Sequence, residues 1–479
     1  MHRPLSRGLS LLSALVALGL LAGADAPPSS PTKPSANALV ILSTTDVKGK
    51  TSPCGCSIPK GGLSRRASFI DSVRIESPLT LAVDNGNFVP EDELHRPVAW
   101  FMMDAMKIMK LDAVGVSPND LRFGYALLQS EARRTALPLT SANLFDRRSR
   151  KTAFAPYLIK TVGKVKVGFF SLMPAAAEIG AARDSVRVED PNAIALKLVP
   201  ELRKKGATVV VLLSQLGKVE SEDLVTSVPG IDAVVCGRNV PMLAKGRTVK
   251  STVASYGGEQ GQYVSRTILN LDAAGKATSG DNETFMLGPT VGENPEMQRL
   301  VKSFEDGLNE ELRKNEKERA AAVELDKQKN ADHFVGAELC GRCHQPEYEQ
   351  WQTTSHSVAW STLVAKQKDA TPDCIPCHVV GYQQPGGFQT GSDAARLSNV
   401  QCENCHGMGT KHDAFASAAH TVGEETCVKC HQGDNDATWN WEKKFPLIAH
   451  GNTTGHTIQN KKVKEAIPAG RMGTAHGGQ

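Results

Sequence analysis

Four short segments of the chain share the pattern Cys-x-x-Cys-His: motif 1 (340–344), motif 2 (374–378), motif 3 (402–406) and motif 4 (427–431). Two cysteines at this spacing can form thioether bonds to the two vinyl groups at one porphyrin edge, and the next residue places an imidazole at the iron. The pattern therefore predicts four covalently bound haem c groups. The attachment residues would be Cys340, Cys343, Cys374, Cys377, Cys402, Cys405, Cys427 and Cys430, and the proximal iron ligands His344, His378, His406 and His431.

Zinc is the main alternative for paired Cys-x-x-Cys units. Histidine is rare in this chain, at 13 of 479 residues, so a histidine directly after all four units is not a chance arrangement. Haem c is also attached outside the cytoplasm, and the beginning of the chain carries an export signal, as described next. Both observations favour haem over zinc.

Residues 1–26 are organised like a secretory signal peptide, with a basic start, an apolar run at 9–21 and small residues before Pro27. A membrane anchor is the alternative, but the apolar run is well short of the roughly 20 residues that span a bilayer. We expect a periplasmic or otherwise exported protein that is not an integral membrane protein after signal cleavage. Residues 27–37 would form a Pro-rich spacer, and a net charge of +4 does not favour nucleic acid as a partner.

Histidines outside the motifs are candidates for the second axial position of each iron. Residues 333–479 contain seven of them and two methionines, which favours ligation by two histidines. The region has few long apolar runs, so the porphyrins themselves must supply much of the buried apolar surface. Four haems in so short a segment must lie close together, and close haems conduct electrons.

The segments CGRCHQPEYEQWQTTSHSVAW, VQCENCHGMGTKH and KFPLIAH resemble the tetrahaem cytochromes c of the hydroxylamine-oxidation pathway in ammonia oxidisers, over roughly residues 335–456. The resemblance implies that His356, His412 and His450 are distal ligands. It also implies that one haem can be five-coordinate. His420 and His456 remain candidates for a fourth distal ligand, and the sequence does not say which distal histidine serves which haem.

Residues 38–292 alternate short apolar runs with helical patterns, which is typical of an α/β architecture. The patterns predict strands at 38–44, 79–84, 112–116, 165–172, 207–214 and 231–237 and helices at 63–74, 97–110 and 192–206. Functional side chains are expected on the loops at the carboxyl ends of such strands.

Those loops carry TTDVKG, GGLSRRASFI, VDNGN, LLSQLG and IDAVVCG, which resemble the calcineurin-like metallophosphoesterases and most closely the exported 5′-nucleotidases. The resemblance implies an α/β/β/α sandwich with a two-metal site, followed here by a mainly helical, haem-packed multihaem cytochrome c domain. The family's metal ligands are largely lost, although Asp46 is kept. The residues at the other ligand positions are Lys48, Asn87, the segment 117–124, Gln215, Arg238 and Val240.

Three cysteines lie outside the haem motifs, and all three fall near the expected cleft of this domain. Cys54 and Cys56 follow the first strand, and Cys236 ends a later one. We expect them to face one cleft, where a thiol site able to bind a soft metal or to form a disulfide would replace the two metals. A structural disulfide or buried free thiols are the alternatives.

Residues 293–332 are predicted to form a charged helical linker, with Leu300, Phe304, Leu308 and Leu312 as its apolar stripe. Residues 333–479 then form the tetrahaem domain.

The whole chain is interpreted as an exported electron carrier fused to an inactive phosphoesterase-like domain, with redox proteins or a quinol-linked donor as partners. Two alternatives stay open: a haem oxidoreductase that acts on a small nitrogen or sulfur compound at one open iron, and an amino-terminal domain that retains phosphoesterase activity or binds an anion. Whether the protein is an enzyme, and its oligomeric state, are not decided.

Overall fold

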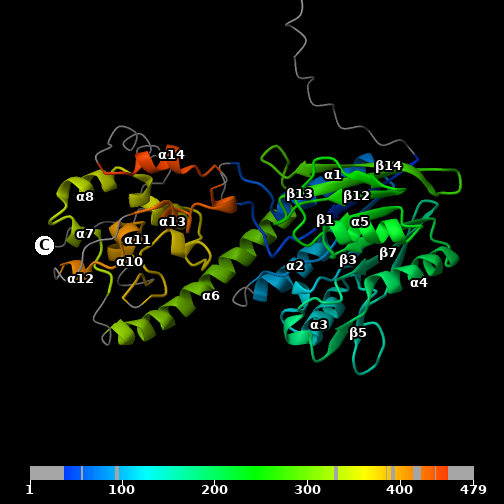
Figure 1. Cartoon of the computed structure of the whole chain (residues 1–479), viewed down its shortest axis with the longest axis horizontal. Coiled ribbons are helices and arrows are strands. Elements are labelled where there is room, and N and C mark those ends of the chain that lie inside the picture. The colour runs from blue at the N-terminus through cyan, green and yellow to red at the C-terminus, as the bar shows by residue number, and fades with distance from the viewer. Residues whose placement is uncertain are drawn as a thin grey trace, which may run out of the picture.

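The computed structural model describes residues 37–54, 58–91, 96–327, 333–384, 386–389, 394–413, 422–436 and 438–450. Figure 1 shows an α/β part in blue to green and a part of short helices in yellow to red, with the long helix α6 (Pro295–Lys327) running from one to the other. The expected signal peptide lies outside the described residues, as do nearly all of the spacer, Cys56, His420 and His456. Among the described residues, no helix is both long and apolar enough to cross a membrane.

Two six-stranded sheets form the amino-terminal part. The first has the order β14-β13-β1-β2-β3-β4, with bounds β1 (Ala38–Thr44), β2 (Thr80–Asp84), β3 (Ala113–Gly115), β4 (Leu139–Thr140), β13 (Tyr263–Leu271) and β14 (Ala277–Met286). The second has the order β11-β12-β10-β9-β7-β6, with bounds β6 (Leu158–Val162), β7 (Val165–Leu172), β9 (Val209–Ser214), β10 (Ala233–Cys236), β11 (Arg247–Val249) and β12 (Thr252–Tyr256). A small third sheet pairs β5 (Leu144–Asp146) with β8 (Val186–Val188).

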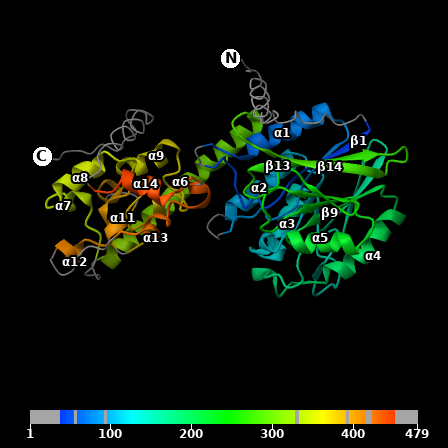
Figure 2. The same ribbon diagram turned by 45° about the horizontal axis from the view of Figure 1, so that its top comes forward.

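Helices cover the outer faces of both large sheets, as Figure 2 shows from a second direction. The helices are α1 (Leu63–Glu76), α2 (Arg96–Ile108), α3 (Tyr125–Thr135), α4 (Pro191–Lys204) and α5 (Lys218–Ser227). The first three pack on the first sheet in one buried cluster, and α4 and α5 pack on the second sheet in another. A third cluster, with Ile41 and Val211, fills the space between the sheets.

This arrangement is the expected α/β/β/α sandwich. Its central strands are buried on both faces, and such strands read as continuous apolar runs rather than as alternating patterns. Every strand and helix predicted above for this part is present, with ends within two residues of the prediction. The antiparallel strands β13 and β14 were not predicted, because polar residues interrupt their apolar pattern.

Helix α6 contacts both parts of the protein. Met297 and Val301 are buried against the α/β part, and the ring of Phe304 stacks on Phe101 at a centroid distance of 4.1 Å. Leu300, predicted to belong to the apolar stripe, is 36% exposed, because the buried face begins at Met297 and not at Leu300. One to three turns further along, Asn309 and Arg313 bind the helical part.

The carboxyl-terminal part consists of short helices and turns. Their bounds are α7 (Ala337–Cys340), α8 (Gln345–Gln352), η3 (Ser355–Val358), α9 (Ala359–Ala365), η4 (Ile375–Cys377), α10 (Ala394–Leu397), α11 (Cys402–His406), α12 (Thr410–Asp413), α13 (Glu424–Cys427), η5 (Gly433–Asn435), α14 (Trp441–Lys444) and η6 (Phe445–Leu447). Its buried apolar cluster is small and centres on Phe334, Ile375 and Phe388. Side chains alone therefore give this part little core, as expected for a domain packed around prosthetic groups.

A buried ion pair joins α1 to β2 beneath the sheet edge that carries the cleft. Nη2 of Arg66 lies 2.9 Å from Oδ2 of Asp84, which also accepts a hydrogen bond from Thr44. Both members of the pair are almost completely buried, and Nε and Nη1 of Arg66 have no protein partner within the described part of the chain. Burial lowers the pKa of the guanidinium, and Asp84 opposes that shift.

Asp84→Asn should therefore destabilise the protein by about 3–5 kcal/mol, because it leaves a buried guanidinium without its counter-ion. Urea unfolding at neutral pH measures this change. The double variant Arg66→Met/Asp84→Asn should recover part of the loss, since it also removes the unpaired charge. A double variant no more stable than Asp84→Asn alone would contradict the assignment.

Candidate haem centre and the adjoining cleft

Each haem motif lies in a single helical turn. In motifs 1 and 4 the histidine amide donates a hydrogen bond to the carbonyl of the first cysteine, as from His344 to Cys340 and from His431 to Cys427, both at 2.9 Å. In motif 2 the amide of His378 donates to the carbonyl of Ile375. The turn brings the histidine back beside the first cysteine, as attachment at one porphyrin edge and ligation of the same iron require.

Six histidine rings form three pairs, and the distance between the two ring centroids is the same in each pair. The ring centroids are 6.1 Å apart in His344 with His412, His356 with His431, and His406 with His450. Two metal–imidazole bonds of about 2 Å each, together with the rings themselves, add up to about this spacing. The residues present therefore fit an iron between the two rings of each pair.

Each of these pairs joins a motif histidine to one of the three distal histidines that the resemblance implied. Motif 1 faces His412 in α12, motif 4 faces His356 in η3, and motif 3 faces His450. The sequence did not reveal this assignment, because partners lie 44 to 75 residues apart along the chain. The candidates His420 and His456 lie outside the described residues.

Motif 2 differs from the other three. Nδ1 of His378 lies 2.7 Å from the carbonyl oxygen of Ala359, so this nitrogen donates to the main chain and Nε2 is the one available to an iron. Burial lowers the pKa of His378, which favours the neutral ring that a metal needs. The three described distal histidines all face other motifs.

The cysteine sulfurs show how the motifs follow one another in space. These thiols stand for the sulfurs that would carry the thioether bonds. The thiols of Cys340 and Cys402 lie close enough to shift each other's pKa, as do those of Cys377 and Cys430, while Cys405 lies close enough to Cys430 for their charges to interact. The spatial order is therefore motif 1, motif 3, motif 4, motif 2. Figure 1 shows α7, which leads into motif 1, at the end farthest from the α/β part.

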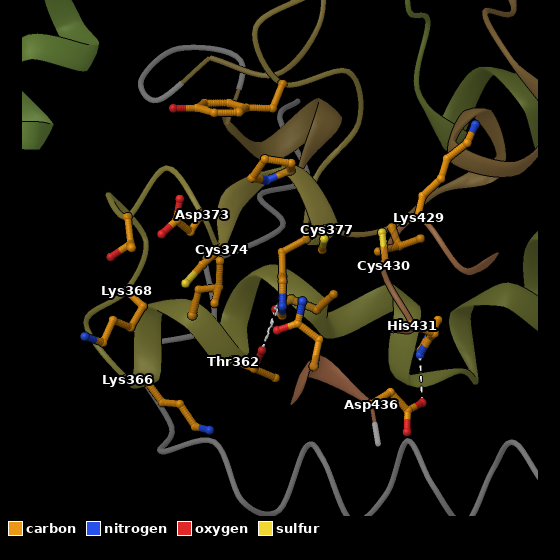
Figure 3. A pocket seen from close by; sticks show the side chains of 18 of the residues that line it. Thr362, Lys366, Lys368, Asp373, Cys374, Cys377, Lys429, Cys430, His431 and Asp436 are labelled. Carbon is orange, nitrogen blue, oxygen red and sulfur yellow. Dashed lines mark hydrogen bonds and ion pairs between the residues drawn. The ribbon is translucent and has the colours of Figure 1, made fainter. Parts of the chain in front are cut away.

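A cavity of about 2120 Å³ lies between the two parts of the protein. Motifs 2 and 4 line it together with His356, helix α6 and the loop 48–54 of the α/β part. Figure 3 shows Cys374, Cys377, Cys430 and His431 around this space, with the ring of His431 bonded to Asp436 at 3.0 Å. Because the attachment cysteines open into it, part of this volume is where the porphyrins would lie.

The cleft of the α/β part holds a closed hydrogen-bond network where the resemblance implied a two-metal site. Oδ1 of Asp46 accepts from the side-chain amide of Asn87 at 2.6 Å, and Oδ2 accepts from Thr45 and from the main chain of Arg238. Asn87 in turn accepts from Asn119 at 3.0 Å. Amide donors therefore occupy the lone pairs of the carboxylate that metal ions would otherwise use.

The ammonium group of Lys48 is paired with carboxylates and does not add an unpaired charge to this network. Its ammonium lies 2.7 Å from Glu259 and 3.1 Å from Glu91. Burial tends to lower the pKa of Lys48, but hydrogen bonds to these two carboxylates raise it above its usual value. The lysine is therefore charged and paired, and its positive charge is neutralised.

The backbone at the cleft keeps the conformation of a functional site. Asp46, Lys48, Asn87 and Arg238 have φ values of 51°, 51°, 60° and 71°, in the left-handed region that non-glycine residues rarely occupy. Such strained residues cluster at ligand sites. Among the described residues, no group of three or more His, Cys, Asp or Glu side chains could hold a metal ion.

The structure does not bring Cys236 to the cleft beside Cys54. Strand alternation turns Val235 towards the space between the sheets and Cys236 towards α5, where its side chain is fully buried. Burial raises the pKa of the Cys236 thiol to about 12. Cys54 instead lines the cavity between the two parts, and Cys236 is a free thiol. The expected common site of three thiols is therefore wrong for Cys236, and Cys56 lies outside the described residues.

Comparison with known proteins divides the chain in the same way. The family described as cytochrome c554 and c-prime matches residues 339–407. Cytochrome c-554 of Nitrosomonas europaea is 30% identical over an alignment of 146 positions, which covers 23% of this chain and 62% of that protein. This match implies covalently bound haem c.

The amino-terminal part is similar to nucleotide phosphoesterases. The 2′,3′-cyclic-nucleotide 2′-phosphodiesterase/3′-nucleotidase of Yersinia enterocolitica is 30% identical over an alignment of 273 positions, which covers 49% of this chain and 40% of that protein. The solved 5′-nucleotidase precursor of Thermus thermophilus shares the fold, with a TM-score of 0.51, 18% identity and coverage of 75% of this chain and 73% of that one. The chain thus spans less than two thirds of either curated relative, and it joins a region similar to 5′-nucleotidases and calcineurin-like phosphoesterases to one similar to cytochrome c554.

Two acidic residues organise the site in ways that were not predicted, although Asp120 lies in the segment 117–124 named above. Asp120 accepts main-chain hydrogen bonds from Asn87, Phe88, Val89 and Ser117 and so shapes one loop of the cleft. Glu305, in the middle of the charged linker, binds Thr51 and Ser52 of the loop 48–54. These last partners are more than 250 positions apart, so no local pattern could reveal the contact.

Asp120 should make stability depend on pH. Burial raises its pKa to about 6, against the N–H donors that lower it. The folded protein then binds this proton more tightly than the unfolded chain does. The stabilisation is fully present below about pH 4 and is lost as the pH rises through about 6, a change of about 3 kcal/mol.

Urea unfolding between pH 4 and 7 tests this dependence in the wild type and in Asp120→Asn, which cannot ionise. The free energy of unfolding of the wild type should fall relative to that of the variant by about 3 kcal/mol over this range. A constant difference between the two proteins would show that Asp120 stays ionised throughout.

Proposed function

We propose that the protein is an exported tetrahaem c-type cytochrome that carries electrons, fused to a phosphoesterase-like domain that has lost its two-metal chemistry. The observation that supports this best is the set of three histidine pairs with centroids 6.1 Å apart. When bound, haem supplies one-electron redox chemistry at low cost in reorganisation. The chain's own residues supply the attachment, the two axial imidazoles and the hydrogen bonds that orient them.

Ligation by two histidines favours electron transfer over catalysis, because it leaves no position for a substrate at the iron. Asp436 orients His431 in the pair with His356, and the carbonyl of Ala359 orients His378. The interactions between cysteines of neighbouring motifs support four attachment sites that lie close to one another. We assign residues 333–479 to this domain, 293–332 to the linker, 38–292 to the phosphoesterase-like domain and 1–37 to the signal peptide and spacer. Its partners would be redox proteins or a quinol-linked donor.

His356→Ala tests the assignment of one pair, His356 with His431. Loss of the distal imidazole should convert one haem from low spin to high spin and let it bind carbon monoxide, because the sixth position of the iron opens. Electron paramagnetic resonance and carbon monoxide difference spectra measure this per haem, with the haem count taken from the pyridine haemochrome. His333→Ala, outside the three pairs, is the matched control. Spectra unchanged by His356→Ala would contradict the assignment.

A haem oxidoreductase acting on a small nitrogen or sulfur compound is the second candidate function. It is favoured by motif 2, where Nε2 of His378 is available while the described distal histidines serve other motifs. The cavity beside this motif gives a small molecule a place to bind. The wild-type spectra of the experiment above decide this point. One high-spin haem that binds carbon monoxide supports the second candidate, and wholly low-spin haem eliminates it.

The phosphoesterase-like domain should bind no pair of divalent metal ions. The side-chain amides of Asn87 and Asn119 occupy positions where carboxylate and imidazole ligands would be required, and the Asp46 carboxylate is already fully hydrogen-bonded. Anion binding at Lys48 is also disfavoured, since Glu91 and Glu259 neutralise it.

Elemental analysis after incubation with Mn²⁺ should therefore find no metal beyond haem iron, and nucleotides and bis(p-nitrophenyl) phosphate should not be hydrolysed. The variant Lys48→His/Asn87→Asp, which restores two ligand types, should bind more Mn²⁺ than the wild type. Hydrolysis by the wild type that Asp46→Asn abolishes would show that the domain remains an enzyme.

A further inference from the structure

The loop 48–54 of the phosphoesterase-like part faces motif 2 of the cytochrome part. Residues Lys48 to Cys54 line the same cavity as Cys374, Cys377 and His378. Lys50 is near enough to Cys374 for a direct interaction between their charges. This loop follows β1 and would lead to the metal centre in an active phosphoesterase. Here its outer side is turned to the haem attachment site instead.

The loop 48–54 forms a fixed wall of the cavity, because its main chain is hydrogen-bonded to neighbouring segments on both sides. The amide of Gly49 donates to Phe88 at 2.8 Å, and the amide of Cys54 donates to Lys60 at 2.9 Å. The carbonyl of Thr51 accepts from the amide of Leu63, the first residue of α1. At Gly62, with φ of 95°, a Cβ would come within 2.8 Å of Pro53, so the loop packs directly on this glycine.

Glu305 of α6 connects the loop 48–54 to the opposite wall of the cavity, which the cytochrome part forms. Its Oε1 accepts hydrogen bonds from Thr51 Oγ1 at 2.7 Å and from Ser52 Oγ at 2.6 Å, and its Oε2 lies 3.3 Å from Nζ of Lys368. Lys368 precedes motif 2 by six residues and also lines the cavity. One carboxylate thus joins the loop of one part to the segment that leads to the haem site of the other.

Two further bonds hold the same segment on α6. The side-chain amide of Asn309 donates to the carbonyl of Gln367 at 2.6 Å, and Arg313 binds Asp369 with two nitrogens, the closer at 2.7 Å. Asn309 is buried, so its bond is shielded from water. Helix α6 therefore forms the floor of the cavity and fixes the distance between its two walls.

We propose that the loop 48–54 is the outer wall of the iron site at motif 2 and controls the entry of small uncharged iron ligands. The proposal rests on the second candidate function, an open axial position at motif 2. The residues that line the cavity include six lysines and six carboxylates, so their charges balance, and three of the lysines lie in ion pairs: Lys48 with Glu91, Lys368 with Glu305, and Lys444 with Asp436. Paired charges give an ion little net attraction, so the site suits a neutral molecule of a few atoms.

Thr51→Val/Ser52→Ala removes both hydroxyl donors to Glu305 and should loosen the wall. Carbon monoxide should then bind the reduced protein about tenfold faster, since each lost hydrogen bond to a carboxylate makes opening easier. Flash photolysis or stopped flow measures the rate. Thr226→Val/Ser227→Ala, the same pair of residue types at the exposed end of α5, is the matched control and should leave the rate unchanged.

Two other variants separate the wall's role from damage to the fold. The exchange Thr51→Ser/Ser52→Thr keeps both hydroxyls and should keep the wild-type rate. Lys368→Gln breaks the tie from the opposite wall and should also accelerate binding. Equal haem content and unchanged visible spectra of the oxidised proteins check that each variant is folded.

Two results of these experiments would contradict the proposal, and they have different consequences for the second candidate function. If the wild type binds no carbon monoxide, the open position at motif 2 does not exist, and both the second candidate function and this proposal fail. If carbon monoxide binds at the same rate in the wild type, Thr51→Val/Ser52→Ala and Lys368→Gln, the open position stands and the loop does not control it.

Discussion

The spacing between two imidazoles that share one iron is the constraint on which the cytochrome part depends. The three pairs with centroids 6.1 Å apart join segments that have no sheet or long helix to align them. The buried cluster of this part is too small to specify a fold by packing alone. The arrangement of this part therefore depends on short turns that hold a cysteine and a histidine together, and on single histidines that lie opposite these turns. In other domains a buried apolar core has this role.

In the phosphoesterase-like part, by contrast, the fold does not depend on the side chains of the site. Its two sheets and helices α1 to α5 form a sandwich held by three apolar clusters, to which the polar side chains of the cleft do not belong. The cleft side chains could therefore change without loss of the fold. The side-chain amide of Asn87 donates to Asp46 and its oxygen accepts from Asn119, while the backbone at Asp46 and Lys48 is left-handed. A scaffold that stable can be reused for another purpose.

The parts that the sequence predicted correctly are those with local signals. Apolar runs located β1 and β9. The haem attachment residues and the distal ligands His356, His412 and His450 stay predictions, from the Cys-x-x-Cys-His spacing and from the resemblance. The pairing of these histidines with motifs could not be predicted, because it depends on where distant turns meet in space. Cys236 was misplaced because a strand residue next to a cleft can point to either face of its sheet.

The interface between the two parts follows from helix α6 and not from either domain alone. Its first turns are packed by Phe304 on Phe101, and its next turns are bonded to the segment before motif 2, so the helix sets the separation of two otherwise independent folds. Glu305 sits at the turn where these two contacts meet and binds both the loop 48–54 and Lys368. A solvated linker of charged residues would need none of these contacts. Their presence on the face that borders the cavity, opposite a motif whose histidine lacks a described partner ring, argues that the fusion of the two domains serves the site between them.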